Sequence, residues 1–291
     1  MLSPPHVGHS PMSAALGGLP ETTELSSVDV PGATLPYWDP GGPGEPGVLM
    51  HGKTGSWRSW EHQIKDLQRN KFRVIAYSRR GHDGSRHSSV GSGVDDLLAL
   101  IDQLGISTCH LVGHAAGGVY ALDFALTYPT RLRSLTLACS TLGLREPEFQ
   151  AAVTLLQPDG LAKLPASFCE LGPAYRITNQ AGVERWRQIE HSSLSDEFIM
   201  QDLRSAMTWN AVEALDVRSL VIAADADLYM PPPLADIAAH HFRNVVRIDI
   251  PDSGHNPQWE RPTEFNRALI HFLIGGHGAM GRGVPGPSEN S

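Results

Sequence analysis

Basic residues and cysteine are scarce in this chain, and long apolar runs are missing. Its 291 residues carry 23 Lys and Arg against 31 Asp and Glu, which gives a formal net charge of −8. This acidic balance, without any basic run, excludes a nucleic-acid partner held through phosphate contacts. No apolar stretch is long enough to cross a bilayer, and no basic region followed by an apolar run opens the sequence. We therefore expect no membrane association and no signal peptide.

The three cysteines, Cys109, Cys139 and Cys169, are an odd set without the spacing of a disulfide framework. Cys109 and Cys139 fall at the start and end of predicted strands. We interpret them as small buried residues in a reducing compartment, which predicts a cytoplasmic protein. No cluster of histidine and cysteine has metal-ligand spacing, so we expect neither a metal nor another cofactor. The oligomeric state is left open.

Short apolar runs alternate with helical patterns along most of the chain. The runs are continuous, as in strands buried on both faces, and cover residues 48–50, 72–77, 110–113, 132–139, 220–224 and 245–250. A hairpin of two edge strands is predicted before them, from Leu25 to Trp38, with its turn at Pro31-Gly32. The alternation predicts an α/β fold with a mainly parallel central sheet and helices on both faces.

One long interruption of this alternation divides the chain. Residues 143–207 are mostly helical and irregular, and we expect them to form a helical lid. The core is then predicted over residues 24–142 and 208–274. We expect a flexible N-terminal segment over residues 1–23, rich in Pro, Gly, Ser and Ala, and a disordered low-complexity tail over residues 275–291.

The segment from Gly113 to Gly118, Gly-His-Ala-Ala-Gly-Gly, joins an apolar strand to a helical pattern. A strand, a sharp turn flanked by small residues and a helix together form the context of a nucleophile elbow, G-x-Nu-x-G. Small residues are needed because the strand and helix backbones nearly touch. The middle position holds Ala115, which has no nucleophilic atom.

Four further polar signals follow predicted strands. They are His51-Gly52, the loop Ser78–Ser85, Asp227 and His255. Ligands of parallel sheets lie beyond the carboxyl ends of the strands, so these signals and Ala115 are expected at one edge. Their chain order of nucleophile position, acid and histidine is that of a hydrolase triad.

These motifs, together with Pro231 and the run Gly254-His255-Asn256-Pro257, make the chain resemble the α/β-hydrolases over about Leu25 to Leu273. The resemblance implies an α/β-hydrolase fold with a serine-type triad at position 115, Asp227 and His255. His255 would be the general base, and Asp227 would orient its ring. Asp225 competes with Asp227, but the proline four residues after Asp227 has the family's spacing.

The resemblance also implies an oxyanion hole made of two backbone N–H groups. One would come from Ala116, which follows the nucleophile position, and the other from Lys53 in the loop after the strand at 48–50. His114 is expected to pack at the elbow without a chemical role.

Alanine at position 115 should prevent nucleophilic hydrolysis. Three explanations compete: a serine replaced by alanine to trap a substrate, a natural binding protein on a hydrolase scaffold, or an aspartate nucleophile as in epoxide hydrolases and dehalogenases. We favour serine, because an intact acid–base pair needs something to activate. Ala116 and Lys53-Thr54 also stand where those aspartate enzymes carry a large aromatic residue and a proline. A cysteine nucleophile fits the geometry but is rarer.

Aromatic side chains in and near the expected lid indicate the substrate. Trp186, Tyr175 and Tyr229 are our candidates for substrate contacts, and they favour a mid-sized apolar carboxylic ester or lactone. A cofactor-free C–C hydrolase or a perhydrolase of the haloperoxidase type is the alternative enzyme. A non-catalytic protein that binds a small molecule is the alternative outside enzymes.

Overall fold

The computed structural model describes residues 24–193 and 200–275. The expected flexible segment over residues 1–23 and nearly all of the expected tail lie outside the described residues. Within the described part, no helix combines the length and apolar character needed to span a membrane. Cys109, Cys139 and Cys169 are all buried free thiols, as expected for small core residues.

A nine-stranded sheet forms the centre of the fold, in the order β1-β2-β4-β3-β6-β7-β8-β9, with β5 paired to β2. The strands are β1 (Ser26–Val30), β2 (Ala33–Trp38), β3 (Glu45–Met50), β4 (Phe72–Tyr77), β5 (Arg86–His87), β6 (Cys109–His114), β7 (Leu132–Ala138), β8 (Ser219–Ala224) and β9 (Val245–Ile250). Pairing is parallel from β4 to β9 and antiparallel at β1, β2 and β5. The predicted fold class is confirmed.

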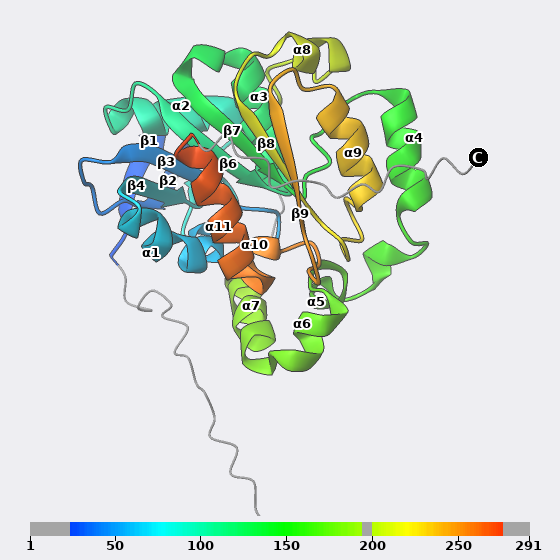
Figure 1. The fold of residues 1–291 in the computed structure, drawn as a ribbon. Coiled ribbons are helices and arrows are strands. Elements are labelled where there is room, and N and C mark those ends of the chain that lie inside the picture. Colours follow the sequence, from blue (N-terminus) through cyan, green and yellow to red (C-terminus); the bar gives the residue numbers. More distant parts are fainter. Residues whose placement is uncertain (1–23, 194–199, 276–291) are drawn as a thin grey trace, which may run out of the picture.

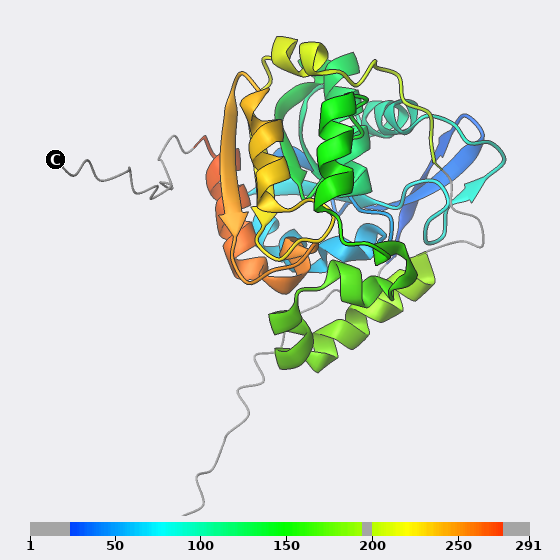
Figure 2. The ribbon, with the colours of Figure 1, turned by 90° about the vertical axis from the view of Figure 1, so that its right-hand side faces the viewer.

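Helices cover both faces of this sheet (Figures 1 and 2). The helices are η1 (Trp57–Trp60), α1 (Glu61–Arg69), α2 (Gly93–Gln103), α3 (Ala116–Thr127), η2 (Pro129–Arg131), α4 (Pro147–Leu156), η3 (Leu161–Lys163), α5 (Ala166–Glu170), α6 (Pro173–Thr178), α7 (Gln180–Ser193), α8 (Trp209–Ala214), α9 (Pro232–His240), α10 (Pro257–Glu260) and α11 (Pro262–Leu273). One core cluster unites α2, α3 and α9 with the sheet, and a second unites η1, α1 and α11 with its other face.

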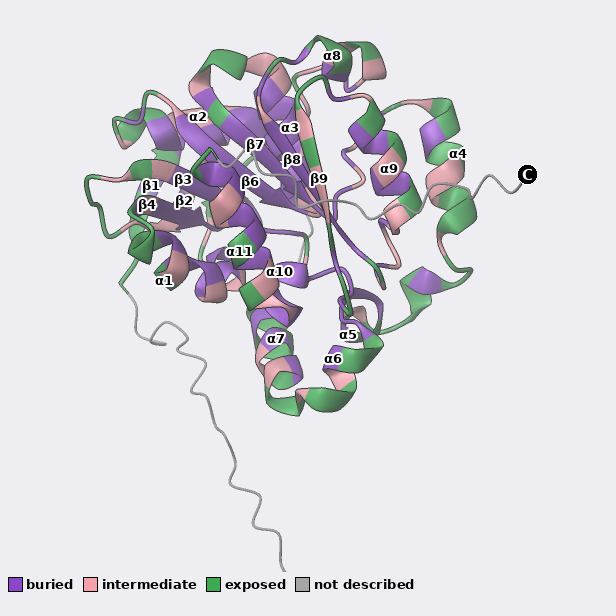
Figure 3. Cartoon of the chain, in the orientation of Figure 1, coloured by how far each residue is buried: buried purple, intermediate pink, exposed green. Residues whose placement is uncertain are grey.

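Strands β3 and β8 are apolar without interruption through Val48–Met50 and Leu220–Ala224, and every residue of these two runs is buried (Figure 3). In β3, Val48 and Met50 belong to the first core cluster, whereas Leu49 between them belongs to the second. Successive side chains of a strand point to opposite faces, so a strand between two helical layers needs apolar residues at every position.

The segment expected as a lid has two parts. Helix α4 packs on α9, and its Phe149 joins the first core cluster. Helices α5, α6 and α7 lie at one end of the molecule (Figure 2) and have a core of their own. That core also contains Trp259 of α10. The helix directly after His255 is therefore packed against the lid.

Arg80 and Asp96 form a buried ion pair that joins the β1–β2 turn to α2. The guanidinium donates to both carboxylate oxygens, at 2.7 and 2.8 Å, and also to the carbonyls of Pro31 and Gly32. Gln201 donates to the same carboxylate. Breaking one side of a buried pair leaves an uncompensated charge.

We predict that Arg80→Met lowers the free energy of unfolding by about 3–5 kcal/mol, since Asp96 would remain buried without its cation. Urea denaturation measures the change. The exposed pair of Arg69 and Asp66 provides the matched control, because the Arg69 side chain is 74% exposed. Arg69→Met should change stability by less than about 1 kcal/mol. Equal effects of the two substitutions would contradict the prediction.

Candidate active site

Ala115 occupies a strained turn between β6 and α3. Its backbone has φ 50° and ψ −117°, a conformation that residues with a side chain rarely adopt. Close packing explains the glycines around it. A Cβ on Gly113 would stand 2.6 Å from Gly118 Cα, and one on Gly117 would stand 2.3 Å from the Met50 carbonyl oxygen. The structure thus has the elbow geometry that the sequence predicts, with a methyl group at its tip.

Asp227 and His255 lie together beyond the ends of β8 and β9. His255 Nδ1 is 2.9 Å from each carboxylate oxygen of Asp227, and both side chains are buried. Asp227 Oδ1 also accepts the backbone N–H groups of Tyr229 and Met230, at 2.8 and 3.1 Å. The loop after β8 therefore aims the carboxylate at the ring. Asp225, the competing acid, is exposed and accepts the N–H of Ser253 instead.

Asp227 and His255 each stabilise the charged form of the other. Burial alone would lower the pKa of His255, but the Asp227 carboxylate outweighs it and the pKa of His255 is raised. Burial alone would raise the pKa of Asp227, but His255 and the two backbone donors bring the pKa of Asp227 below its usual value. Nδ1 donates to the carboxylate, which leaves Nε2 as the ring atom able to accept a proton.

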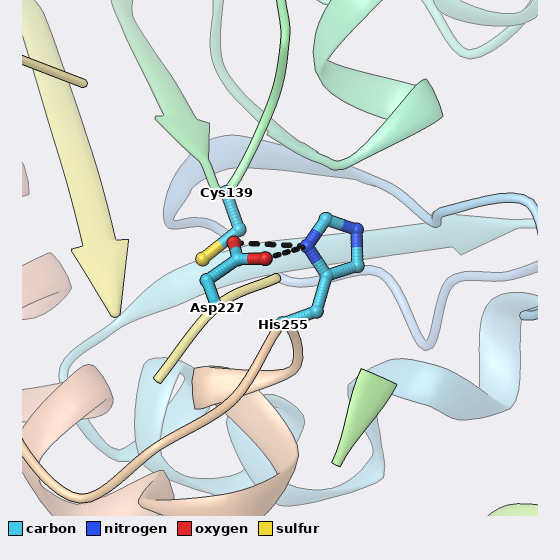
Figure 4. Close-up of side chains that lie close together, drawn as sticks. All are labelled: Cys139, Asp227 and His255. Carbon is cyan, nitrogen blue, oxygen red and sulfur yellow. Dashed lines mark hydrogen bonds and ion pairs between the residues drawn. The ribbon is translucent and has the colours of Figure 1, made fainter. Parts of the chain in front are cut away.

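Cys139 is the third side chain of this cluster (Figure 4). It follows β7 with φ 49°, and its sulfur, a carboxylate oxygen of Asp227 and a ring nitrogen of His255 all lie within 4.8 Å of one another. Burial, and then the Asp227 charge, raises the pKa of the Cys139 thiol, which disfavours the thiolate and hence a nucleophilic role. Cysteine, aspartate and histidine are zinc ligands. A metal here would replace the proton between His255 and Asp227.

The expected oxyanion donors lie next to Ala115. Lys53 and Ala116 line the same cavity as Ala115 and His255. Ala116 is the first residue of α3, where backbone N–H groups have no acceptor within the helix and the helix dipole favours negative charge. His114 packs behind the elbow, where its Nε2 lies 2.7 Å from the His255 carbonyl oxygen. Burial lowers the pKa of His114 to about 3, so this ring is neutral.

A cavity of about 610 Å³ opens over Ala115. Apolar side chains of α3, η3 and the loop after η3 form much of its wall, with Val119, Leu161 and Leu164 among them. Tyr229 also lines the cavity, and its ring centroid lies 4.7 Å from that of His255.

The other two aromatic candidates do not line the cavity. Tyr175 and Trp186 are 8% and 5% exposed, and they pack with Val183 and Ile189 in the core of the lid. The expected substrate contacts at Tyr175 and Trp186 are therefore corrected. Val183, Trp186 and Ile189 recur at every third position of α7, and Tyr175 of α6 joins them in that core, so these side chains hold the two helices together.

Two glutamates that sequence reasoning did not select tie the lid to the His255 loop. Glu170 of α5 accepts Thr54 Oγ1 at 2.7 Å and Asn256 Nδ2 at 3.1 Å. Glu260 accepts the N–H groups of Gly172, Gly254 and Asn256, at 2.7, 3.0 and 3.2 Å. Burial raises the pKa of Glu260 to about 7, although the three amide donors oppose the shift.

We predict an acid limb in the activity of the Ala115→Ser form, with a midpoint above the ordinary histidine pKa of about 6.5. His255 must be neutral to accept a proton, and its pKa is raised, so activity is lost as the pH falls through that raised value. The profile of kcat/KM between about pH 5 and 9 measures the limb. The Glu170 charge, and less strongly that of Glu260, also raises the pKa of His255, so Glu170→Gln should move the limb to lower pH. A flat profile would contradict the prediction.

Comparisons with known proteins agree with the fold. A profile of the alpha/beta hydrolase family matches residues 48–268. A RutD protein of Caulobacter sp. (strain K31), provisionally named a carbamate hydrolase, is 29% identical over 246 residues, covering 78% of this chain and 90% of that protein. The chain belongs to the alpha/beta hydrolase family.

Solved structures share the fold. A thermophilic esterase from Thermogutta terrifontis superposes with a TM-score of 0.74 and 24% identity, over 88% of this chain and 100% of that chain. The enol-lactonase from Burkholderia xenovorans LB400 superposes with a TM-score of 0.69 and 20% identity, over 86% and 100% of the two chains.

Proposed function

We propose that this protein is the nucleophile-to-alanine form of a serine hydrolase that cleaves a carboxylic ester or lactone. The observation that carries the proposal is the Asp227–His255 pair, with Nδ1 at 2.9 Å from both carboxylate oxygens, lining one cavity with an elbow at Ala115. Such a pair raises the basicity of Nε2, and a hydroxyl at position 115 is the group that this basicity would serve.

In the Ala115→Ser form the reaction is acyl transfer. The serine oxygen attacks the carbonyl carbon while His255 Nε2 takes the hydroxyl proton, and Asp227 stabilises the imidazolium. The N–H groups of Lys53 and Ala116 hold the oxyanion. The C–O bond to the alcohol then breaks, and His255 returns the proton to the leaving oxygen. Water repeats these steps on the acyl-enzyme and releases the acid.

The cavity supports a mid-sized, largely apolar substrate. Its volume of about 610 Å³ lies within the range of small-molecule sites, and Val119, Leu161 and Leu164 supply apolar wall. Tyr229 stands beside His255 and is the substrate contact that we retain. The buried thiols fit a reducing compartment, and we place the protein in the cytoplasm.

Assaying the Ala115→Ser form tests the reaction class, with the Ala115 form as control. Short p-nitrophenyl esters and a matched lactone should be hydrolysed by the serine form alone. Hydrolysis of a carbamate in preference to both would change the substrate class. Cleavage of a C–C bond, or peroxide-dependent halogenation, would support the alternative enzymes. Ligand binding without turnover in either form would support the binding protein and overturn the hydrolase.

A further inference from the structure

Arg79 is a buried guanidinium without a carboxylate partner. It follows β4, and only 2% of its surface is exposed. Within residues 24–193 and 200–275, no carboxylate oxygen lies within 4.0 Å of its side-chain nitrogens, whereas the neighbouring Arg80 is paired with Asp96. A buried charge is costly unless something compensates it, so its surroundings need an explanation.

The groups around Arg79 are uncharged. Burial lowers the pKa of His51 well below its usual value and that of His82 to about 3, so both rings are neutral. Arg79 Nη2 lies 3.4 Å from His82 Nε2, and the guanidinium stands 5.0 Å from the centroid of the Tyr120 ring. Burial also lowers the pKa of Arg79 itself, although a guanidinium stays protonated at neutral pH.

The hydrogen bonds of Arg79 are directed at the loop that follows β3. Its Nε donates to the His51 carbonyl and its Nη2 donates to the Gly52 carbonyl, both at 3.2 Å. Its backbone N–H donates to His51 Nε2 at 3.0 Å. His51 Nδ1 is therefore the protonated nitrogen, and it donates to the same Gly52 carbonyl at 2.7 Å.

The Gly52 carbonyl belongs to the peptide group whose N–H is that of Lys53. A peptide group that accepts charge-assisted bonds at its oxygen is polarised, which makes its N–H a stronger donor. The Lys53 N–H is one of the two oxyanion donors in the proposed function. The Arg79 guanidinium and the His51 Nδ1–H thus polarise the Lys53 N–H through the Gly52 carbonyl. Neither side chain lines the cavity.

We infer that Arg79 is a positioning residue for the oxyanion hole: it fixes the His51–Gly52 carbonyls and polarises the Gly52–Lys53 peptide toward developing negative charge. The inference rests on the proposed function. Arg79 itself does not line the cavity, so it acts through the Lys53 N–H and touches neither substrate nor product.

Removing Arg79 should therefore affect the transition state more than the bound ester. Loss of a whole oxyanion donor lowers kcat by about 10²–10³-fold, and weakening one donor should cost about 10–100-fold. In the Ala115→Ser form, Arg79→Met is expected to lower kcat on p-nitrophenyl butyrate by that factor and to change KM by less than about twofold. Arg79→Lys keeps the charge and should recover part of kcat.

The control is a variant that removes a different buried arginine, one with no contact to the loop after β3. Arg247 of β9 is 4% exposed at its side chain and pairs with Asp236 and Asp249. Arg247→Met should lower the urea midpoint but leave kcat unchanged. A kcat for Arg79→Met no lower than that of Arg247→Met would overturn the inference, as would a loss that lies in KM alone.

A binding measurement on the Ala115 form separates this inference from the proposed function. Butyrate mimics the charge of the oxyanion, whereas butyramide does not. Arg79→Met should weaken butyrate binding about 10-fold and leave butyramide binding unchanged by calorimetry, and Arg79→Lys should bind butyrate more tightly than Arg79→Met. Equal losses for both ligands overturn the inference. An inert Ala115→Ser form with an Arg79-dependent preference for butyrate would overturn only the hydrolase.

Discussion

Replacing Ala115 by serine is expected to raise the hydrolysis of p-nitrophenyl butyrate by about 10⁴–10⁶-fold over the Ala115 form, because removal of a triad serine costs about 10⁶ in turnover. The backbone at position 115 already has φ 50° and ψ −117°, and its N–H is bonded to the Ala138 carbonyl at 2.9 Å. A hydroxyl therefore enters a turn that is already formed. Release of p-nitrophenol at saturating substrate measures the gain.

The gain must depend on His255. Adding His255→Ala to the Ala115→Ser form should return the rate to that of the Ala115 form, because removing the serine or the histidine alone costs about as much as removing both. A serine form that is active without His255 would contradict the mechanism. Ala115→Asp with an epoxide substrate tests the aspartate explanation, and turnover by that variant alone would replace serine with aspartate as the nucleophile.

Replacing Asp227 by asparagine in the Ala115→Ser form is expected to lower kcat by about 10⁴-fold. The carboxylate holds His255 Nδ1 protonated, whereas an amide that donates to Nδ1 would select the other tautomer. Two backbone N–H groups bind Asp227 Oδ1, so the carboxamide oxygen is favoured at that position and its NH₂ faces the ring. Steady-state kinetics measures the loss.

Asp225→Asn is the matched control, two residues away on the same loop. Asp225 is exposed, and among the described contacts its carboxylate accepts only the Ser253 N–H, so its replacement should change kcat by less than about twofold. A similar loss in both variants would point to the loop as a whole. A loss in Asp225→Asn alone would reverse the assignment of the acid.

Strands were predictable from short runs rich in apolar residues, both inside the sheet, as at β4, and at its edge, as at β9. Residues Phe72–Tyr77 and Val245–Ile250 form strands with the predicted bounds. Strand β3 begins at Glu45, three residues before the predicted start. The prediction left out residues 45–47 because Pro46 and Gly47 are typical of turns. Parallel pairing with β4 holds these residues in the sheet, and this pairing is not visible in the local sequence.

The positions at strand ends were predictable because the parallel sheet brings them to one edge. The structure brings Asp227 to His255, and it places Ala115 and His255 on one cavity. Glu170 and Arg79 could not be found in the same way. The role of Glu170 follows from the contact of α5 with the loop at Thr54, which the local sequence does not show. The role of Arg79 follows from the burial of its guanidinium against backbone carbonyls without a carboxylate, which only the packing reveals. Tyr175 and Trp186 show that aromatic composition does not separate cavity wall from lid core.

The strained turn at Ala115 also bears on the history of the chain. A non-glycine residue in such a conformation lowers stability by about 1–3 kcal/mol. Glycine would adopt the same backbone angles at little cost, so a protein selected only to hold a ligand would become more stable through a single replacement here. A side chain at the tip of the elbow therefore lowers stability without any benefit unless it carries an atom that takes part in the reaction.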